Sequence, residues 1–418
     1  MIVYFWVMKW LYRLGVFLIR LCLPLIGLIS PKIVPFLKGR KGLFEKLTQF
    51  KQSNPGQLVW IHVASLGEYE QAKPVIESLK SARPKYKIVV SFFSPSGYDN
   101  VVKKAQEYVD YVTYIPLDSR RNAVKFIEIL NPIMVFFVKY DLWYNYLNET
   151  KVREIPLYLI SAAFRSDQIY FKKIPFFRNL LFRFDQIFTQ NQSSLDLLKT
   201  IGYQNAVLTG DTRFDRIVHT AKNPKQFPEI ALWAENYPVL VAGSVWQEDM
   251  NLLITLMNAN DTYKWIIAPH SLDPVPMSEW ESKLKIISKR YSKWDKSEDC
   301  QALFIDNIGM LSSLYQFSHL SYIGGAFGKG LHNILEPIGF GSPVIFGKLK
   351  EVSKFPEAAQ SQLQGCGFEV KDLKELEHVF QQLQNSDFYN QSKAAAIAWV
   401  KANQGAAGRI IEKIHLID

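Results

Sequence analysis

Cysteine is scarce in this chain of 418 residues, and its three cysteines, Cys22, Cys300 and Cys366, lie far apart. Since no two of them form a Cys-x-x-Cys pair, we expect neither a disulfide framework nor a cysteine-rich zinc site, and a reducing compartment is the default. The seven histidines never approach the spacing of metal ligands, and Asp-x-Asp does not occur. The sequence therefore predicts no metal site and no cofactor.

Signatures of several other protein classes are also missing. There is no Gly-x-Ser-x-Gly turn of a serine hydrolase and no Gly-Lys-Ser/Thr of a Walker loop. Basic residues are scattered rather than interleaved with aromatic residues on one element, which argues against nucleic acid as a partner. However, 49 Lys and Arg against 39 Asp and Glu give a formal charge of +10. This excess favours an anionic partner, such as an acidic lipid surface or a phosphorylated substrate.

The amino-terminal residues 1–30 are the most apolar stretch of the chain, yet Lys9, Arg13 and Arg20 interrupt them. Internal charges and the lack of an Ala-x-Ala site argue against a cleaved signal peptide. On a helix the three cations fall within about 40° of one another. A narrow cationic stripe on an apolar helix with Trp and Tyr is typical of a helix lying in the membrane interface. A spanning helix and an ordinary buried helix remain alternatives.

After residue 50, short apolar runs alternate with stretches of helical length. Ten runs, in two series of five, are typical of buried parallel strands: 57–65, 87–94, 111–117, 133–140, 157–164, 238–244, 264–270, 302–306, 320–327 and 343–347. Helices are predicted between them, for example at 68–82, 98–108 and 119–130. Two successive series predict an α/β fold of two doubly wound, Rossmann-like domains. We expect three parts: a membrane-anchoring helix with its exit at 1–38, one domain at 39–217, and a second at 218–418 whose last helix is a candidate to pack back on the first domain.

The first loop of interest is Ser65-Leu66-Gly67-Glu68, directly after a predicted strand. In doubly wound sheets, ligands bind at the carboxyl ends of the strands. Gly67 permits close backbone approach to a ligand, and Glu68 places a carboxylate at this edge. Ser-x-x-Glu is equally the pattern of a capping box, with Ser65 as the N-cap and Glu68 reaching back to its amide. From the residues alone, both roles of Glu68 remain open.

The second loop is the glycine-rich run GGAFGKGLHNILEP at 324–337, which follows a predicted strand and is expected to open a helix. Gly324 and Gly325 free backbone amides to approach an anion, and a helix start adds its dipole. Lys329 and His332 can supply charge or hydrogen bonds. The glycine spacing departs from the dinucleotide fingerprint, so a nucleotide phosphate site is the better interpretation.

Three weaker features accompany this loop. Asn333 and Glu336 have the spacing of a capping pair, which is the structural alternative for Glu336. Ser244 follows a strand and can bind a phosphate or form a plain turn. His270 ends a strand after Pro269, and a half-buried structural histidine is its alternative.

Six motifs carry a resemblance that covers the chain from about residue 42 to residue 408: WIHVASLGE (60–68), SFFSPSGY (91–98), PLDSRRNAVKFIEILNP (116–132), TGDTRFD (209–215), AGS (242–244) and GGAFGKGLHNILEP (324–337). Together they resemble the 3-deoxy-D-manno-oct-2-ulosonic acid (Kdo) transferases of lipopolysaccharide synthesis. The resemblance implies a GT-B fold, with the acceptor bound in the first Rossmann-like domain and the donor in the second. It further implies transfer of Kdo from CMP-Kdo to a lipid A precursor (lipid IVA), without a metal, with inversion, at the cytoplasmic face of the inner membrane.

The resemblance also implies roles for particular residues. Glu68 matches the proposed general base of the family, His270 a histidine after a donor-domain strand, and Ser244 the donor-side turn. Lys329 lies within the motif that matches the CMP-binding loop. The other residues matching that loop are Gly324, Gly325, His332, Asn333 and Glu336. The residues expected to bind the acceptor or shape its site are Ser65, Gly67, Asp141 and Arg165.

The chain departs from the family pattern in three places. The family often has Glu-x-Glu-Leu-Trp-Pro-Asn where residues 139–145 read KYDLWYN. Its usual Asn-Ala-Arg is Ser-Ala-Ala at 161–163, which leaves Arg165 as a displaced candidate, and an Arg before the histidine is Pro269. These departures concern contacts with acceptor and donor rather than the reaction class. The rival hypotheses are another GT-B enzyme that uses a UDP-sugar and a lipid acceptor, and a nucleotide-binding membrane protein without activity.

Overall fold

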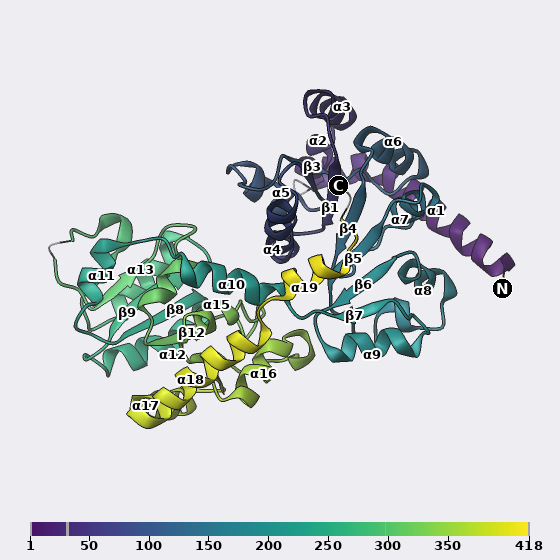
Figure 1. Ribbon diagram of the computed structural model, residues 1–418. Coiled ribbons are helices and arrows are strands. Elements are labelled where there is room, and N and C mark those ends of the chain that lie inside the picture. The colour runs from purple at the N-terminus through teal and green to yellow at the C-terminus, as the bar shows by residue number, and fades with distance from the viewer. Residues whose placement is uncertain (1, 31–32, 297, 417–418) are drawn as a thin grey trace. The chain divides into compact units, whose positions relative to one another are not determined.

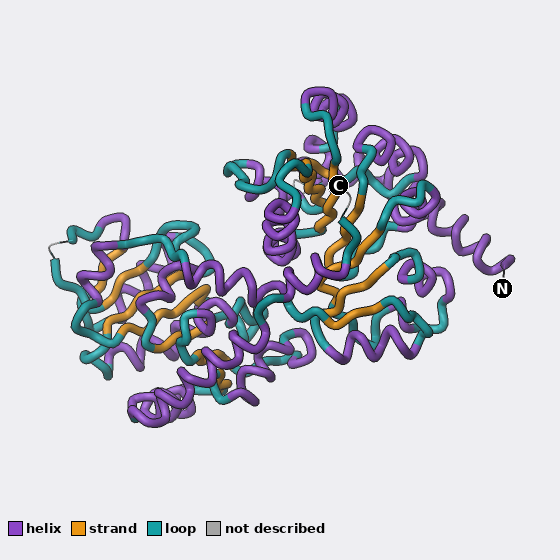
Figure 2. Tube along the Cα trace, viewed as in Figure 1, coloured by secondary structure: helices purple, strands orange, loops and turns teal. Residues whose placement is uncertain are grey.

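The computed structural model of the chain describes residues 2–30, 33–296 and 298–416 and divides into two compact units (Figure 1). The first unit holds residues 1–216 and 405–418, and the second holds residues 217–404. The boundary falls within helix α10 (Thr212–Lys222). Each unit consists of strands with helices around them (Figure 2).

The first unit is built on a seven-stranded parallel sheet with the order β3-β2-β1-β4-β5-β6-β7. Its strands are β1 (Leu58–Val63), β2 (Lys87–Phe92), β3 (Tyr111–Tyr114), β4 (Met134–Val138), β5 (Leu157–Ala162), β6 (Gln186–Thr189) and β7 (Ala206–Leu208). Its helices besides α10 are α1 (Ile2–Ile29), α2 (Ile33–Gly39), α3 (Leu43–Ser53), α4 (Leu66–Ala82), α5 (Pro95–Val102), α6 (Arg120–Leu130), α7 (Tyr144–Val152), α8 (Pro175–Leu181), α9 (Gln192–Thr200) and α19 (Ala406–Lys413), with a 3₁₀ turn at Ile169–Phe171.

The second unit has a parallel sheet of the same kind, ordered β10-β11-β9-β8-β12-β13-β14. Its strands are β8 (Val239–Val245), β9 (Lys264–Pro269), β10 (Ser288–Arg290), β11 (Ala302–Phe304), β12 (Leu320–Ile323), β13 (Val344–Gly347) and β14 (Gly367–Val370). Its helices are α11 (Pro228–Ala234), α12 (Gln247–Asn258), α13 (Pro274–Lys283), α14 (Leu311–Leu314), α15 (Leu335–Gly339), α16 (Pro356–Gln364), α17 (Leu373–Gln384) and α18 (Ser386–Asn403), with 3₁₀ turns at Tyr291–Lys293, Tyr315–Phe317 and Val352–Lys354.

The central strands are largely apolar because both faces of each sheet are covered. In β1, Trp60 belongs to one core cluster, while its neighbours Val59 and Ile61 belong to another on the opposite face. The continuous apolar runs found in the sequence are therefore those of buried parallel strands. The predicted fold class, two doubly wound α/β units, is confirmed.

The sequence did not predict four of the strands, and it extended one helix too far. The strands β6, β7, β10 and β14 are only three or four residues long, and three of them form sheet edges. Runs this short are too brief to show a periodic pattern of apolar residues. The helix expected at 98–108 begins earlier and ends at Val102.

The first unit also contains the two ends of the chain. Helix α1 is a single helix with Pro24 inside it, and its segment Trp6–Ile29 is long and apolar enough to cross a membrane. Its Tyr12 hydroxyl donates a hydrogen bond of 2.6 Å to Asp118, so one face of the helix docks on the unit. At the other end of the chain, Ala407 of α19 is part of a core cluster of this unit.

The other face of α1 is uncovered. Its side chains include Trp6, Trp10, Phe17, Leu21 and Leu25, and each of these is more than half exposed. Only 6% of the apolar window is buried, which is not the pattern of an ordinary buried helix.

Candidate active site

Near its centre, each sheet has a point where the strand order reverses direction, and several of the residues singled out in the sequence lie at these two points. In the first unit the reversal lies between β1 and β4, and in the second it lies between β8 and β12. Glu68 and Asp141 follow β1 and β4, while Ser244 and Gly324 lie at the ends of β8 and β12. Ligands of open α/β sheets bind outside the carboxyl ends of strands at such a reversal.

In the first unit, Glu68 is a buried carboxylate at the start of α4. It is 7% exposed, and its Oε2 accepts the backbone N–H of Ala64. Burial raises the pKa of Glu68 and the charge of Asp141 adds to the rise, while the Ala64 hydrogen bond, His62 and Lys139 oppose it. A carboxylate with a raised pKa is a stronger base when it is ionised.

The capping-box hypothesis holds only in part. Ser65 is the N-cap of α4, but its side chain makes no capping hydrogen bond. Glu68 does reach back to the backbone, yet to the amide of Ala64 rather than that of Ser65. The Glu68 carboxylate therefore stabilises the turn between β1 and α4, and it also lies at the carboxyl end of the central strand β1.

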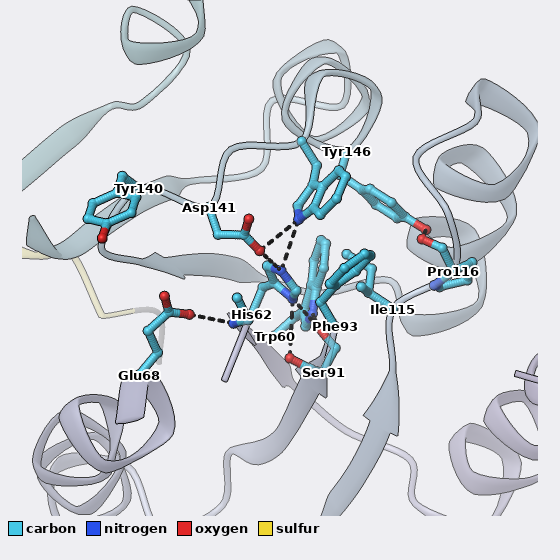
Figure 3. A network of polar contacts seen from close by, with 12 residues as sticks. Trp60, His62, Glu68, Ser91, Phe93, Ile115, Pro116, Tyr140, Asp141 and Tyr146 are labelled. Atoms are coloured by element: carbon cyan, nitrogen blue, oxygen red, sulfur yellow. Dashed lines mark hydrogen bonds and ion pairs between the residues drawn. The ribbon is translucent and has the colours of Figure 1, made fainter. Parts of the chain in front are cut away.

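Asp141 belongs to a polar network that sequence reasoning missed (Figure 3). Its Oδ2 lies 3.1 Å from Nε2 of His62 and accepts the indole N–H of Trp143 at 2.9 Å. On the far side of the imidazole, Nδ1 of His62 lies 2.9 Å from Oγ of Ser91, which also accepts the indole N–H of Trp60 at 2.8 Å. His62 is fully buried, whereas 26% of the Asp141 side chain is exposed.

The remaining candidates of the first unit have less specific surroundings. Ser65 is exposed, and a Cβ added at Gly67 would meet no atom within 4 Å, so a ligand can approach the backbone there. Arg165 is 42% exposed and pairs with Asp167 at 3.4 Å, and no interaction of the described residues joins it to Glu68 or Asp141. The structure therefore does not bring Arg165 to the other candidates.

In the second unit, an aromatic stack lies at the ends of β8 and β9. The ring of His270 stacks on Trp246 with centroids 4.1 Å apart, and the ring of His332 lies 4.7 Å from that of His270. The ammonium of Lys329 lies 5.6 Å from the centre of the Trp246 ring. Ser244, at the end of β8, has a positive φ of 55°. Such strained backbone is concentrated at functional sites.

The glycines at 324–325 are required by the packing of the protein itself. A Cβ at Gly324 would lie 2.6 Å from Ser244 O and from Asp249 Oδ2, and one at Gly325 would lie 2.4 Å from Gly330 O. The amide of Gly324 donates to Gly243 O, and that of Gly325 donates to Asp249. Both amides are therefore used within the protein, which corrects the expectation that they point at an anion.

The residues after the loop form a short turn rather than a strong helix start. Asn333 accepts the amide N–H of Leu335, and its Nδ2 donates to Oε1 of Glu336 at 3.2 Å. Glu336 thus contacts the side chain of Asn333. Helix α15 has only five residues, so the helix dipole expected here is small.

Asp249 anchors this region, and the sequence analysis did not identify it. It is 1% exposed, and Oδ2 accepts the amides of Trp246 and Gly325 while Oδ1 accepts the hydroxyl of Tyr322. One side chain thus ties the end of β8 to the glycine-rich loop. Its position three residues after the helix N-cap was the only signal in the sequence.

His332 is expected to make the second unit acid-sensitive. Burial, helped by the charge of His270, lowers the pKa of His332 to about 4 from 6.5. Between these two pH values the unfolded chain binds a proton that the folded chain does not, so acid favours unfolding. The melting temperature should fall more between pH 7 and pH 5 in the wild type than in His332→Gln. Equal losses in both proteins would contradict this assignment.

A separate cavity of the second unit, of about 570 Å³, does not coincide with these residues. Its walls include Trp233, Tyr237, Lys264 and Trp294. Lys264 is the first residue of β9, so this cavity lies at the amino ends of the parallel strands, away from the glycine-rich loop.

Comparison with known proteins agrees with the resemblance read from the motifs. Residues 40–216 match the family model of 3-deoxy-D-manno-octulosonic-acid transferase (kdotransferase). A 3-deoxy-D-manno-octulosonic acid transferase of Aquifex aeolicus is 28% identical over 346 residues, covering 80% of this chain and 89% of the relative. The chain is thus similar to Kdo transferases over most of its length. It is therefore a glycosyltransferase.

Other similar proteins differ in how much of their own length this chain covers. A bifunctional glycosyltransferase/methyltransferase of Fusobacterium nucleatum is 25% identical over 92% of this chain, but the chain spans only 61% of that protein's length. Among solved structures, a UDP-N-acetylglucosamine 2-epimerase of Listeria monocytogenes aligns with a TM-score of 0.61 at 15% identity, covering 85% of this chain and 95% of the epimerase. At this identity the likeness supports the GT-B type of fold alone.

Proposed function

We propose that this chain transfers Kdo from CMP-Kdo to a lipid A precursor (lipid IVA). The observation that carries the proposal is the similarity to Kdo transferases. It extends over 80% of the chain in the Aquifex protein, and the family model matches residues 40–216, which include the loop of Glu68. The alternative, a UDP-sugar as donor, is supported only by the general fold. No feature of the glycine-rich loop favours it.

The proposed reaction needs one base at the reversal of strand order in the first unit, between β1 and β4. A hydroxyl of the acceptor sugar attacks the anomeric carbon of Kdo, the bond from that carbon to the phosphate oxygen breaks, and CMP leaves. The hydroxyl proton passes to Glu68, whose carboxylate lies at the end of β1. Because CMP leaves as a stable phosphate monoester, no paired general acid is required. The reaction is expected to invert the anomeric centre and to need no metal.

The donor is proposed to bind at the reversal of strand order in the second unit, between β8 and β12. The stacked rings of Trp246 and His270 offer a flat surface there, and the ammonium of Lys329 lies 5.6 Å from the centre of the Trp246 ring. Ser244 and His332 supply hydrogen-bonding groups, and His332 is neutral above about pH 4 because of its lowered pKa. Asn333 and Glu336 would contact the nucleotide from the turn before α15.

One assay tests the proposed function. Purified protein is incubated with CMP-Kdo and a tetraacylated lipid A precursor, and the products are counted by mass spectrometry. We expect addition of Kdo and release of CMP, and the masses give the number of Kdo units. UDP-sugars serve as the control donors. Transfer from a UDP-sugar without transfer from CMP-Kdo would overturn the proposal.

Membrane attachment at the cytoplasmic face of the inner membrane is part of the proposal. Helix α1 docks through Tyr12 and leaves its apolar face uncovered. Burial and the nearby charges of Arg13, Arg120 and Arg183 lower the pKa of Lys9, so these four cations lie near one another. An apolar face bordered by cations suits anionic lipid headgroups.

Protease added outside spheroplasts is expected to leave an amino-terminal tag intact, because α1 lies in the interface without crossing it. Permeabilised spheroplasts provide the control in which the tag must be cleaved. As a matched variant, Lys9, Arg13 and Arg20 are replaced by Gln, and binding to vesicles containing anionic lipid should fall. Cleavage of the tag in intact spheroplasts would show instead that α1 spans the membrane.

A further inference from the structure

We propose that His62 is a positioning residue that holds the Asp141 carboxylate so that its second oxygen accepts a hydrogen bond from a hydroxyl of the acceptor sugar. The inference rests on the proposed function for its substrate class. It adds a second carboxylate, that of Asp141, to the base Glu68. It also gives a role to the buried His62, which takes no part in the proposed reaction.

Each ring nitrogen of His62 has two polar neighbours. Nδ1 lies 2.9 Å from Ser91 Oγ and 3.2 Å from the Ser91 carbonyl oxygen, and Nε2 lies 3.1 Å from Asp141 Oδ2 and 3.2 Å from the indole nitrogen of Trp143. An indole N–H can only donate, so Trp60 uses an acceptor site of Ser91 Oγ. The Ser91 hydroxyl can then donate to Nδ1 of His62, at 2.9 Å. The indole N–H of Trp143 lies nearer to Asp141 Oδ2, at 2.9 Å, than to Nε2 of His62, at 3.2 Å. With the indole hydrogen directed at the carboxylate, Nε2 carries the hydrogen that faces Asp141 Oδ2 at 3.1 Å. The opposite tautomer would place an unprotonated, buried nitrogen against a carboxylate oxygen, which is unfavourable.

The same contacts fix the orientation of the Asp141 carboxylate. Its Oδ2 receives two donors, from His62 and from Trp143. Its Oδ1 receives no hydrogen bond from the described residues. Figure 3 shows this second oxygen pointing away from the imidazole ring of His62. Two donors on one oxygen leave the other as a fixed acceptor at a partly exposed position.

The place of Asp141 in the fold suits contact with the acceptor. It follows β4, directly beside the β1 end that holds Glu68, and the two carboxylates are close enough for Asp141 to raise the pKa of Glu68. The preceding Lys139 has a positive φ of 62°, which costs backbone energy in a residue with a side chain. The loop after β4 is thus held in a strained form that places Asp141 at the reversal of strand order between β1 and β4.

The first test is a set of steady-state measurements on full-length protein with both substrates varied. Asp141→Asn keeps an oxygen for His62 and Trp143 but turns an amide donor toward the acceptor, so the acceptor KM should rise about tenfold or more. The KM for CMP-Kdo should stay within about twofold. His62→Phe should raise the acceptor KM in the same way, whereas His62→Gln, which keeps a side-chain donor, should restore part of it.

A double variant separates positioning from structural support. If His62 acts through Asp141, adding His62→Phe to Asp141→Asn should not raise the acceptor KM further. Phe126→Leu is the matched control, since the buried Phe126 ring packs against Trp60 beside the same network but has no group that can hydrogen-bond in it. It should lower the melting temperature with little change in acceptor KM. Additive effects of the His62 and Asp141 substitutions on KM would overturn the proposal.

A spectroscopic test does not depend on transfer activity. In protein labelled with ¹⁵N-histidine, the signals of His62, identified by their loss in His62→Gln, should show a proton on Nε2. A lone proton on Nδ1 would refute the positioning role even if the enzyme transfers Kdo. Conversely, a protonated Nε2 in a protein that transfers no Kdo would overturn only the proposed function.

Discussion

Replacement of Glu68 by Gln is expected to lower Kdo transfer at least about a hundredfold, the lower end for loss of a general base. Glutamine has nearly the same shape and keeps an oxygen that can accept the Ala64 amide, so the turn between β1 and α4 should survive. The change removes only the capacity to take a proton. Transfer is measured with CMP-Kdo and the lipid acceptor, and folding and CMP affinity should stay near wild type.

The pH dependence gives a second readout of the same residue. Burial raises the pKa of Glu68 above its usual value of 4.5. A base must be ionised to act, so the wild-type rate should be lost as the pH falls through this raised pKa. The acid limb should be absent in Glu68→Gln. Nearly full turnover in the glutamine variant would leave Glu68 as a cap of α4 and nothing more.

Gly324→Ala is expected to abolish CMP binding. The added Cβ would lie 2.6 Å from three groups, namely Asp249 Oδ2, Ser244 O and Val245 Cα, two of which are backbone. The end of β8 and the start of the glycine-rich loop would have to move apart, which breaks the hydrogen bonds that Asp249 makes to both. Calorimetry with CMP measures the loss, and a lowered melting temperature should accompany it.

Gly328→Ala is the matched control within the same loop. Its added Cβ would meet only Glu248 Oε1, at 3.8 Å, and Gly328 is exposed. The same substitution four residues away should therefore leave CMP affinity and stability almost unchanged. If Gly324→Ala bound CMP as well as Gly328→Ala does, the glycine-rich loop would not be the donor site.

Much of the architecture could be predicted from the sequence because central parallel strands are long and apolar on both faces. The runs around Trp60 and Trp265 stand out for this reason, and each is followed by a loop with Gly, Ser or a carboxylate. Strand order could be expected in outline, since two series of strands and helices imply doubly wound sheets. Glu68 and the glycine-rich run could be found because their motifs are contiguous in the chain.

The tertiary structure alone decided how these loops work. Asp249 lies 76 residues before Gly325 and His62 lies 79 residues before Asp141, so no local pattern links either pair. Their hydrogen bonds form because strands distant in sequence become neighbours in the sheet and end at one edge. A buried amide or imidazole must then find a partner among the side chains that the fold places there.

The sequence by itself determined which segments are buried and where carboxylates and glycines follow strands. The folded sheet decided which of these groups form hydrogen bonds within the protein. The amides of Gly324 and Gly325 do so, whereas Oδ1 of Asp141 accepts no hydrogen bond from the described residues. Sequence alone could not decide this, because a hydrogen bond depends on the distance between two groups in space and not along the chain.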